Sequence, residues 1–182
     1  MTFSPTERTV AWAGFKSLGI LDYESGQTNT FPISRTLGFC NPSFSPDGRE
    51  LAFGGPTNIM ILDMATRTPR PFAAIDNAVL SLAFSPNGSL LASAHDGGAV
   101  TLWDRASGSP ITNILAHPPF AVGVEFSRDG RLLASGGADG TGKLWEVIPR
   151  GLQLRYTLRG HLGFMNLVFF ARRLPRCFRQ HQ

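Results

Sequence analysis

A stretch of 40 to 42 residues recurs along this chain. In its last complete copy, Phe126 precedes a polar turn, a short apolar run follows, and a Gly- and Asp-rich turn leads to a second apolar run that ends at Trp145. The same order is found 42 residues earlier, between Phe84 and Trp103. Apolar runs this short, set between turn residues, indicate β-strands rather than helices. Because the pattern repeats, the chain is expected to be an array of similar β units.

Two further copies precede these, one beginning at Phe44 and one, more divergent, at Phe3. A complete copy contains four short predicted strands, and this number with this period is typical of one blade of a β-propeller. The predicted fold class is therefore all-β, a propeller of four-stranded antiparallel blades. About four blades are expected to be present, which makes the propeller incomplete.

The repeats end on a recognisable dipeptide. Trp103-Asp104 closes one copy, Trp145-Glu146 is a near match, and Gly160-His161 opens the next. These residues resemble the WD-repeat β-propeller family, and the resemblance covers nearly the whole chain. It implies a non-catalytic scaffold that binds proteins or peptides through loops at its rim and central opening. Four copies in register argue strongly for the fold, whereas function depends on sites that differ between members of a fold.

The repeat divides the chain into units that correspond to blades. The first unit is expected to lack its inner strand, because the chain begins at the Phe that normally ends that strand. The predicted division is 1–35, 36–75, 76–116 and 117–160, the start of a next unit at 161–170, and a basic tail at 171–182 that is not blade-like.

The resemblance also implies a structural hydrogen-bond network in the last complete unit, formed by His117, Ser135, Asp139 and Trp145. The chemistry is consistent, since an indole N–H only donates, a hydroxyl and a neutral imidazole both donate and accept, and a carboxylate accepts. The alternative is that His117 is a solvated loop residue. The matching network in the preceding unit is predicted to be broken, with Ile75 at the histidine position and Gly97 at the aspartate position.

No catalytic, cofactor-binding or metal-binding residues are predicted. His95 and Asp96 follow Ser93, but we expect His95 to lie in a surface turn, and no nucleophile elbow accompanies it. Cys40 and Cys177 show no metal-ligand or disulfide spacing. The aspartates of the repeats are interpreted as turn formers.

The C-terminal tail is strongly basic. Seven of the 17 Lys and Arg residues lie between Arg150 and Arg179, and no Asp or Glu follows Glu146. The repeat should continue after Phe170 with Ser-Pro-Asp-Gly, and codons exist that restore this continuation when they are read one base later. We therefore hypothesise that the last dozen residues are out of frame, and the alternative is a disordered basic tail.

The sequence favours a protein-protein interaction scaffold that acts in the cytoplasm, without a cofactor and without nucleic-acid or membrane partners. No apolar run approaches the ~20 residues that span a bilayer, and no signal peptide is visible. The alternative function is a propeller domain of a larger hydrolase or a periplasmic translocation-type propeller. The incomplete ring makes self-association possible, and a closed four-blade ring is a further alternative if residues 167–170 complete the first blade.

Overall fold

The computed structural model describes residues 1–14, 16–33, 40–55 and 57–159. These residues form four four-stranded antiparallel sheets and no helix, which confirms the predicted fold class. Each sheet consists of four consecutive strands, so each is one propeller blade. The strands are β1 (Thr2–Phe3), β2 (Thr9–Ala13), β3 (Ser17–Asp22), β4 (Thr28–Pro32), β5 (Ser43–Phe44), β6 (Glu50–Gly54), β7 (Asn58–Asp63), β8 (Pro69–Ala74), β9 (Val79–Phe84), β10 (Leu90–His95), β11 (Ala99–Asp104), β12 (Pro110–Leu115), β13 (Ala121–Phe126), β14 (Leu132–Gly137), β15 (Gly142–Ile148) and β16 (Gly151–Leu158).

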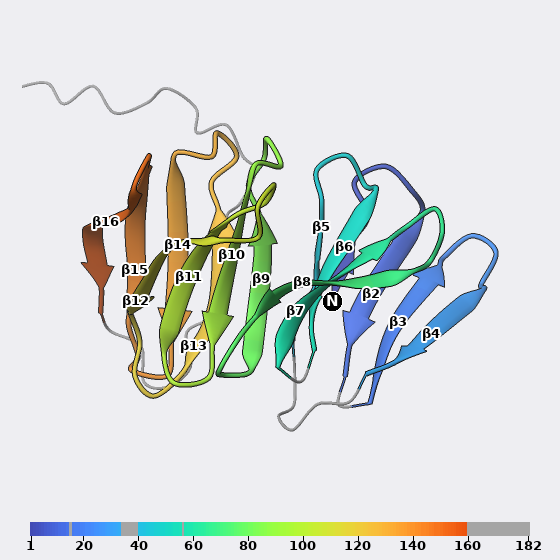
Figure 1. Cartoon of the computed structure of the whole chain (residues 1–182), viewed down its shortest axis with the longest axis horizontal. Coiled ribbons are helices and arrows are strands. Elements are labelled where there is room, and N and C mark those ends of the chain that lie inside the picture. The colour runs from blue at the N-terminus through green and yellow to red at the C-terminus, as the bar shows by residue number, and fades with distance from the viewer. Residues whose placement is uncertain (15, 34–39, 56, 160–182) are drawn as a thin grey trace, which may run out of the picture.

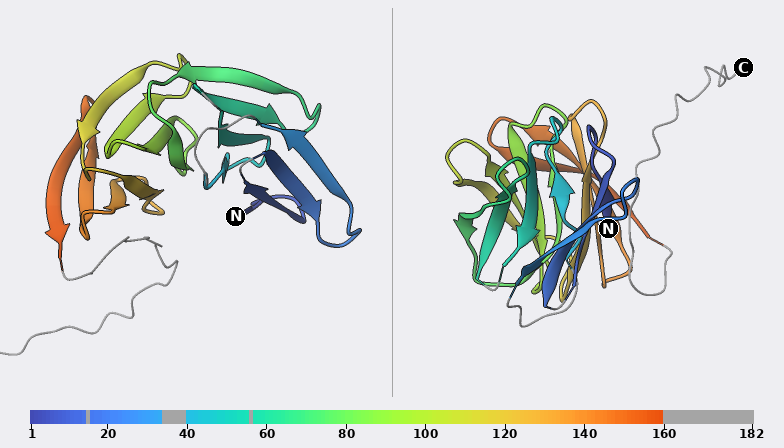
Figure 2. Two further views of the ribbon diagram at one scale, coloured as in Figure 1. Left: turned by 90° about the horizontal axis from the view of Figure 1, so that it is seen from below. Right: turned by 90° about the vertical axis from the view of Figure 1, so that its right-hand side faces the viewer.

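The blades stand side by side in an arc (Figure 1). The view along the strands shows that β4, β8, β12 and β16 follow the outer, convex side of the arc, and that the described blades do not close into a ring (Figure 2). Blade 1 (β1–β4) and blade 4 (β13–β16) stand at the two ends. Residues 167–170, which the closed four-blade ring would require, lie outside the described residues.

The expectation that blade 1 lacks its inner strand is wrong. Thr2 and Phe3 form β1, which pairs with Ala11 and Val10 of β2. Two residues are enough for this ladder, and the inner strand of blade 2 is equally short, whereas β9 and β13 have six residues each. The sequence pattern missed β1 because a two-residue strand has no periodicity to detect.

The turn between the first two strands of a blade is closed by its own side chains. Ser45 Oγ donates to Asp47 Oδ1 at 2.6 Å and accepts the Glu50 N–H at 2.9 Å. Gly48 adopts a φ of 70°, a conformation that side chains with a Cβ rarely adopt. The same bonds recur at Ser85 and Ser127, so the repeated motif specifies one turn geometry.

The aspartate that ends the third strand closes the next turn. Asp104 Oδ1 accepts the Ser107 N–H at 2.8 Å and the Ser107 hydroxyl at 2.7 Å. These hydrogen bonds hold the pKa of Asp104 below its usual value. In blade 4, Glu146 occupies this position and pairs with Arg155 at 2.8 Å. There the two strands run on to Ile148 and Gly151, so a different turn replaces the aspartate-closed one.

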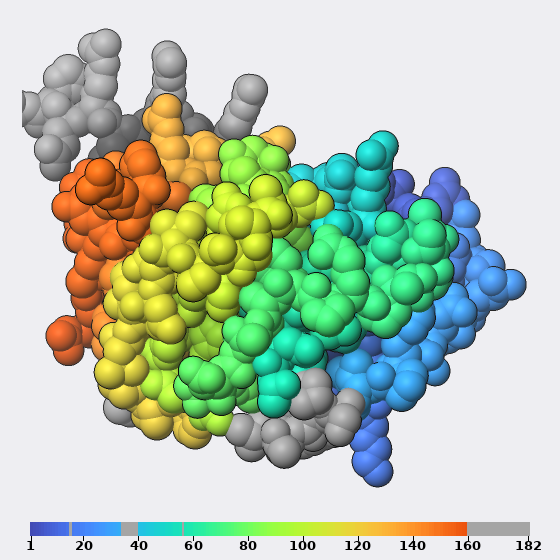
Figure 3. Space-filling view, in the orientation of Figure 1, coloured from blue at the N-terminus to red at the C-terminus, as the bar shows by residue number. Residues whose placement is uncertain are grey.

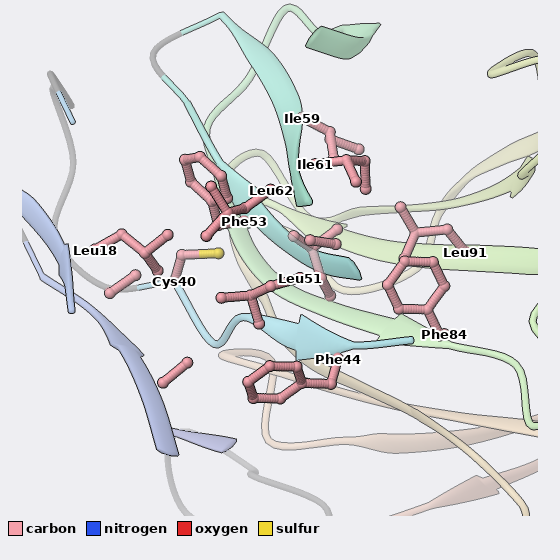
Figure 4. Packing of buried hydrophobic residues seen from close by; sticks show 14 of the residues in the cluster. Leu18, Cys40, Phe44, Leu51, Phe53, Ile59, Ile61, Leu62, Phe84 and Leu91 are labelled. Atoms are coloured by element: carbon pink, nitrogen blue, oxygen red, sulfur yellow. The ribbon is translucent and has the colours of Figure 1, made fainter. Parts of the chain in front are cut away.

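The core lies between the blades rather than within them. One cluster joins blades 1, 2 and 3, and it includes Leu18, Cys40, Phe44 and Leu51 (Figure 4). A second cluster joins blades 3 and 4. In the space-filling view the adjacent blades form one continuous body (Figure 3). Burial of apolar side chains between neighbouring sheets is therefore the main force that holds the array together.

Candidate functional site

The four residues predicted to form a network in blade 4 lie within hydrogen-bonding distance of one another. Trp145 Nε1–H donates to Ser135 Oγ at 2.8 Å, and Ser135 Oγ lies 2.7 Å from His117 Nε2. His117 Nδ1 lies 3.0 Å from Asp139 Oδ1. Since the indole can only donate and the carboxylate accepts, the Ser135 hydroxyl donates to Nε2, and Nδ1–H donates to Asp139. Ser135 and His117 have no exposed surface.

His117 reaches this site from a loop that links two blades. It follows β12, the outer strand of blade 3, and its backbone N–H donates to Gly98 O at 2.9 Å. Gly137 makes room for the ring, since a Cβ at that position would lie only 2.2 Å from His117 Cβ. The loop that enters blade 4 is thereby fastened both to its own blade and to blade 3.

Blade 3 contains a second network of the same kind. Trp103 Nε1–H donates to Ser93 Oγ at 2.7 Å, and Ser93 Oγ lies 2.7 Å from His95 Nε2. His95 Nδ1 lies 3.5 Å from the Asn77 carbonyl oxygen. His95 ends β10 and is 4% exposed. The prediction that His95 lies in a surface turn is therefore wrong. The four-residue pattern of blade 4 is absent in blade 3, as predicted, but His95 supplies a ring to Ser93 and Trp103 from another position.

The two networks take their histidine from different places in the repeat. In blade 4 it is His117, in the loop before the inner strand, and Gly137 lies two residues after Ser135. In blade 3 the loop position holds Ile75, and His95 lies two residues after Ser93. In both blades the imidazole Nε2 lies 2.7 Å from the serine Oγ, so the two histidine positions direct their rings into the same space and only one of them can carry a ring. The signal in the sequence that could have predicted the blade 3 network is the histidine two residues after the serine, His95 after Ser93.

Both imidazoles are neutral by the same physical argument. Burial lowers the pKa of His117, although the hydrogen bond and charge of Asp139 oppose this effect. Burial also lowers the pKa of His95, and the bond to Asn77 opposes it. Burial raises the pKa of Asp139, but hydrogen bonds from His117 and Thr141 outweigh it and hold that pKa below its usual value.

The Ser93–His95 pair has the residue types of a catalytic dyad but not its geometry. Ser93 has no exposed surface, and its oxygen already accepts the indole N–H of Trp103. A nucleophile must be reachable by a substrate, so this arrangement ties strands together instead. Within residues 1–14, 16–33, 40–55 and 57–159, no group of three or more His, Cys, Asp or Glu residues is placed to hold a metal ion.

Two surface features offer contacts to other molecules. A hollow of about 550 Å³ lies against the inner strands and is lined by Asn41, by Ser81 to Phe84 and by Gly123 to Phe126, among other residues. At the rim, Asp96 forms an isolated bridge with Phe120, whose side chain is 37% exposed. The sequence did not single out these features, because they depend on how separate repeats meet in space.

Comparison with known proteins agrees with this geometry. The family model for the WD domain, G-beta repeat (WD40), matches residues 71–104 and 108–146. The chain therefore contains WD40 repeats. The first matched WD40 segment begins within β8 and the second just before β12, both outer strands, and each ends on the third strand of the next blade, so consecutive WD40 repeats interlock neighbouring blades. Trp103 and Asp104 end the first segment, whereas Gly160 and His161 lie outside the described residues.

The chain is also similar to Protein groucho of Drosophila melanogaster. The two are 33% identical over 114 residues, which is 60% of this chain and 16% of groucho. The match thus spans about a sixth of that relative's length. None of the described residues forms a helix long and apolar enough to cross a membrane.

A double-mutant cycle tests the exchange of histidine positions. His95→Gly is expected to lower the free energy of unfolding by about 1–3 kcal/mol, because it leaves the Ser93 hydroxyl buried without its acceptor. Adding Ile75→His should recover most of this loss by building the arrangement of blade 4. Ile75→His alone should destabilise the chain, because two rings compete for one space. Urea unfolding gives the free energy of unfolding of the unmodified chain, the two single variants and the double variant. If the changes in this free energy simply add, the proposed exchange of histidine positions is contradicted.

The free energy of unfolding should also decrease as the pH is lowered through the range in which imidazole titrates. The folded pKa values of His95 and His117 are lowered, so the unfolded chain binds more protons once the pH drops below about 6.5. The contribution of the neutral rings is complete above about pH 6.5 and is lost as the pH falls toward the folded values. Thermal unfolding between about pH 7.5 and 5.5 measures this, above the range in which ordinary carboxylates titrate.

His95→Gln is the matched control for the pH experiment. Its amide keeps a donor and an acceptor but cannot titrate. The pH dependence of its melting temperature should therefore be shallower than that of the unmodified chain. Equal slopes in the two chains would contradict the assignment of the effect to His95.

Proposed function

We propose that this chain is a non-catalytic scaffold that binds protein segments through its rim loops and central hollow. WD40 repeats and the similarity to groucho support a role in protein-protein interaction in general. The finer proposal, binding at the rim, is supported by a patch formed by Asp76, Asn77, Asp96 and Phe120, hereafter the rim patch. Nothing observed supports the alternatives of a hydrolase-attached or a periplasmic translocation-type propeller.

The exposed aromatic ring of Phe120 carries this proposal. Aromatic residues supply much of the binding energy of protein interfaces, since they bury a large area with little loss of conformational freedom. Its bridge partner Asp96 follows β10, and the neighbouring Gly97 lies close to the side chain of Asn77. Backbone bonds from Asp96 N to Ala78 O and from Ala138 N to Phe120 O fix these loops. The patch is therefore a pre-organised surface.

The chemistry of the rim patch indicates the kind of segment that it would bind. Phe120 offers apolar contact, and Asp76 and Asp96 offer negative charge beside it. A peptide with an apolar side chain next to Lys or Arg would complement both features. A cytoplasmic location, the absence of a cofactor and the absence of nucleic-acid partners remain predictions from the sequence. The same is true of the division into units and of the out-of-frame tail, which lies outside the described residues.

Selection of peptides from a displayed random library on the immobilised chain tests the proposed binding. Enriched peptides should combine an apolar residue with a neighbouring basic one. Phe120→Ala should weaken their binding about tenfold or more, as expected for a central aromatic contact, and Asp96→Asn should weaken it less. Ile148→Ala is the matched control, because Ile148 on blade 4 is 37% exposed, as Phe120 is, but lies outside the rim patch. Unchanged affinity for the Phe120→Ala chain would contradict the proposal.

A further inference from the structure

We propose that a second copy of this chain binds head to tail, with its blade 1 packed against blade 4. The contact would join two surfaces that have no neighbour among the described residues. The leading face is the side of blade 1 that points away from blade 2, and the trailing face is the side of blade 4 that points away from blade 3. The leading face contains Phe3, Leu21 and Tyr23, and the trailing face contains Leu132, Leu144, Tyr156 and Leu158.

The leading face exposes a residue that every other blade buries. Phe3 is 67% exposed, whereas its repeat equivalents Phe44, Phe84 and Phe126 are 7%, 8% and 6% exposed. Each of these three phenylalanines packs in a cluster that includes residues of the preceding blade. Phe3 occupies the same place in the repeat, and no other blade among the described residues covers it, so the leading face has the composition of an inter-blade contact.

The trailing face shows the same feature from the other side. In blades 1 to 3, Ile20, Ile61 and Leu102 point toward the next blade and are 1%, 1% and 0% exposed. Their equivalent Leu144 is only half-buried. Leu158 is 54% exposed. Its equivalent in blade 3, Ile114, instead packs against the second core cluster. These apolar side chains are those that contact the next blade elsewhere in the array.

One pair of repeat positions shows how blades recognise each other. Across blades 2 and 3, Glu50 at the start of β6 pairs with Arg105, just after β11, at 2.5 Å. Across blades 3 and 4 the same two positions hold Leu90 and Val147, which both pack against the second cluster. Opposite charges thus meet at one junction and apolar side chains at the next.

Across blades 1 and 2 these positions hold Thr9 and Met64, which are 5% and 4% exposed. A backbone hydrogen bond identifies the residue that corresponds to Arg105 in each blade. In blade 2 the Met64 N–H donates to Arg49 O, just before Glu50, at 2.9 Å. In blade 1 the Tyr23 N–H donates to Arg8 O, just before Thr9, at 3.0 Å. Tyr23 is therefore the structural equivalent of Arg105.

The two unmatched members of this series are Leu132 on the trailing face and Tyr23 on the leading face. Both are apolar over most of their surface, so they agree in kind as Leu90 and Val147 do between blades 3 and 4. Tyr23 contacts the Phe3 ring edge to face at 6.4 Å, as Arg105 lies 5.9 Å above Phe84. A second copy of this chain carries the leading face that fits Leu132, and its own trailing face fits this chain's Tyr23.

This contact is heterologous, because different surfaces of the two copies meet. Two copies joined at both ends would form a closed ring of eight blades, at the upper end of the range of ~4–8 found in propellers. The expected particle is a dimer of 39.4 kDa, which is twice the 19.7 kDa of one chain. Closure would cover both terminal faces at once.

Light scattering after size exclusion, with the full 182-residue chain over a dilution series, tests the proposal. The unmodified chain should be a dimer that dissociates on dilution. Tyr23→Arg and Leu132→Glu should each weaken dimerisation about tenfold or more, because each places an unpaired charge in an apolar contact. The chain with both changes should regain the dimer, since each junction then carries an acid–arginine pair like Glu50–Arg105.

Matched controls place the same charges outside the proposed contact. Gln27→Arg lies in the turn before β4, and Asn113→Glu lies on β12, and neither should change the dimer. A purely monomeric unmodified chain would overturn the proposal. So would a dimer that persists in both single variants, or a double variant that does not regain the dimer. Longer head-to-tail assemblies that follow the same pattern of loss and recovery would support the contact.

Discussion

Burial of each sheet between two neighbours is the constraint on which this structure depends. A four-stranded sheet with apolar residues on both faces cannot bury them by itself. In blades 2 and 3 both faces are covered: Leu51 and Leu91 on one face have no exposed surface, and Ile61 and Leu102 on the other are 1% and 0% exposed. Blades 1 and 4 each keep one face without a neighbour among the described residues. The repeat therefore specifies an array, and the same packing that holds the array together makes its two ends suitable for association.

The polar networks add specificity to this packing. Each one joins the second and third strands of its blade through a serine and a tryptophan, and a histidine fixes the loop that enters the blade. In the series of hydrogen bonds that runs from Trp145 to Asp139, every donor has an acceptor, so the buried polar groups of this network do not oppose folding. Ser93 and Trp103 achieve the same arrangement with His95. The geometry around the serine is therefore kept, although the position that supplies the ring changes.

Much of the fold could be predicted from the sequence, because turn motifs and short apolar runs are local signals. The period, the strand pattern and the positions of Ser135 and Trp145 follow from such signals. The role of His95 could not, since it depends on whether a neighbouring loop leaves space for the ring. The two-residue strand β1 was missed for lack of periodicity. The exposure of Phe3 and Phe120 likewise depends on which blades meet, which one repeat does not reveal.

Hydrogen exchange of backbone amides in the Tyr23→Arg chain, the variant designed to remain monomeric, tests the central claim most directly. Exchange reports the free energy of local opening, so it compares blades within one molecule. If coverage of both faces determines stability, the amides of β6 and β10 should exchange more slowly than those of β2 and β14. Equal protection of the four strands, or slower exchange in β2 and β14, would contradict the account.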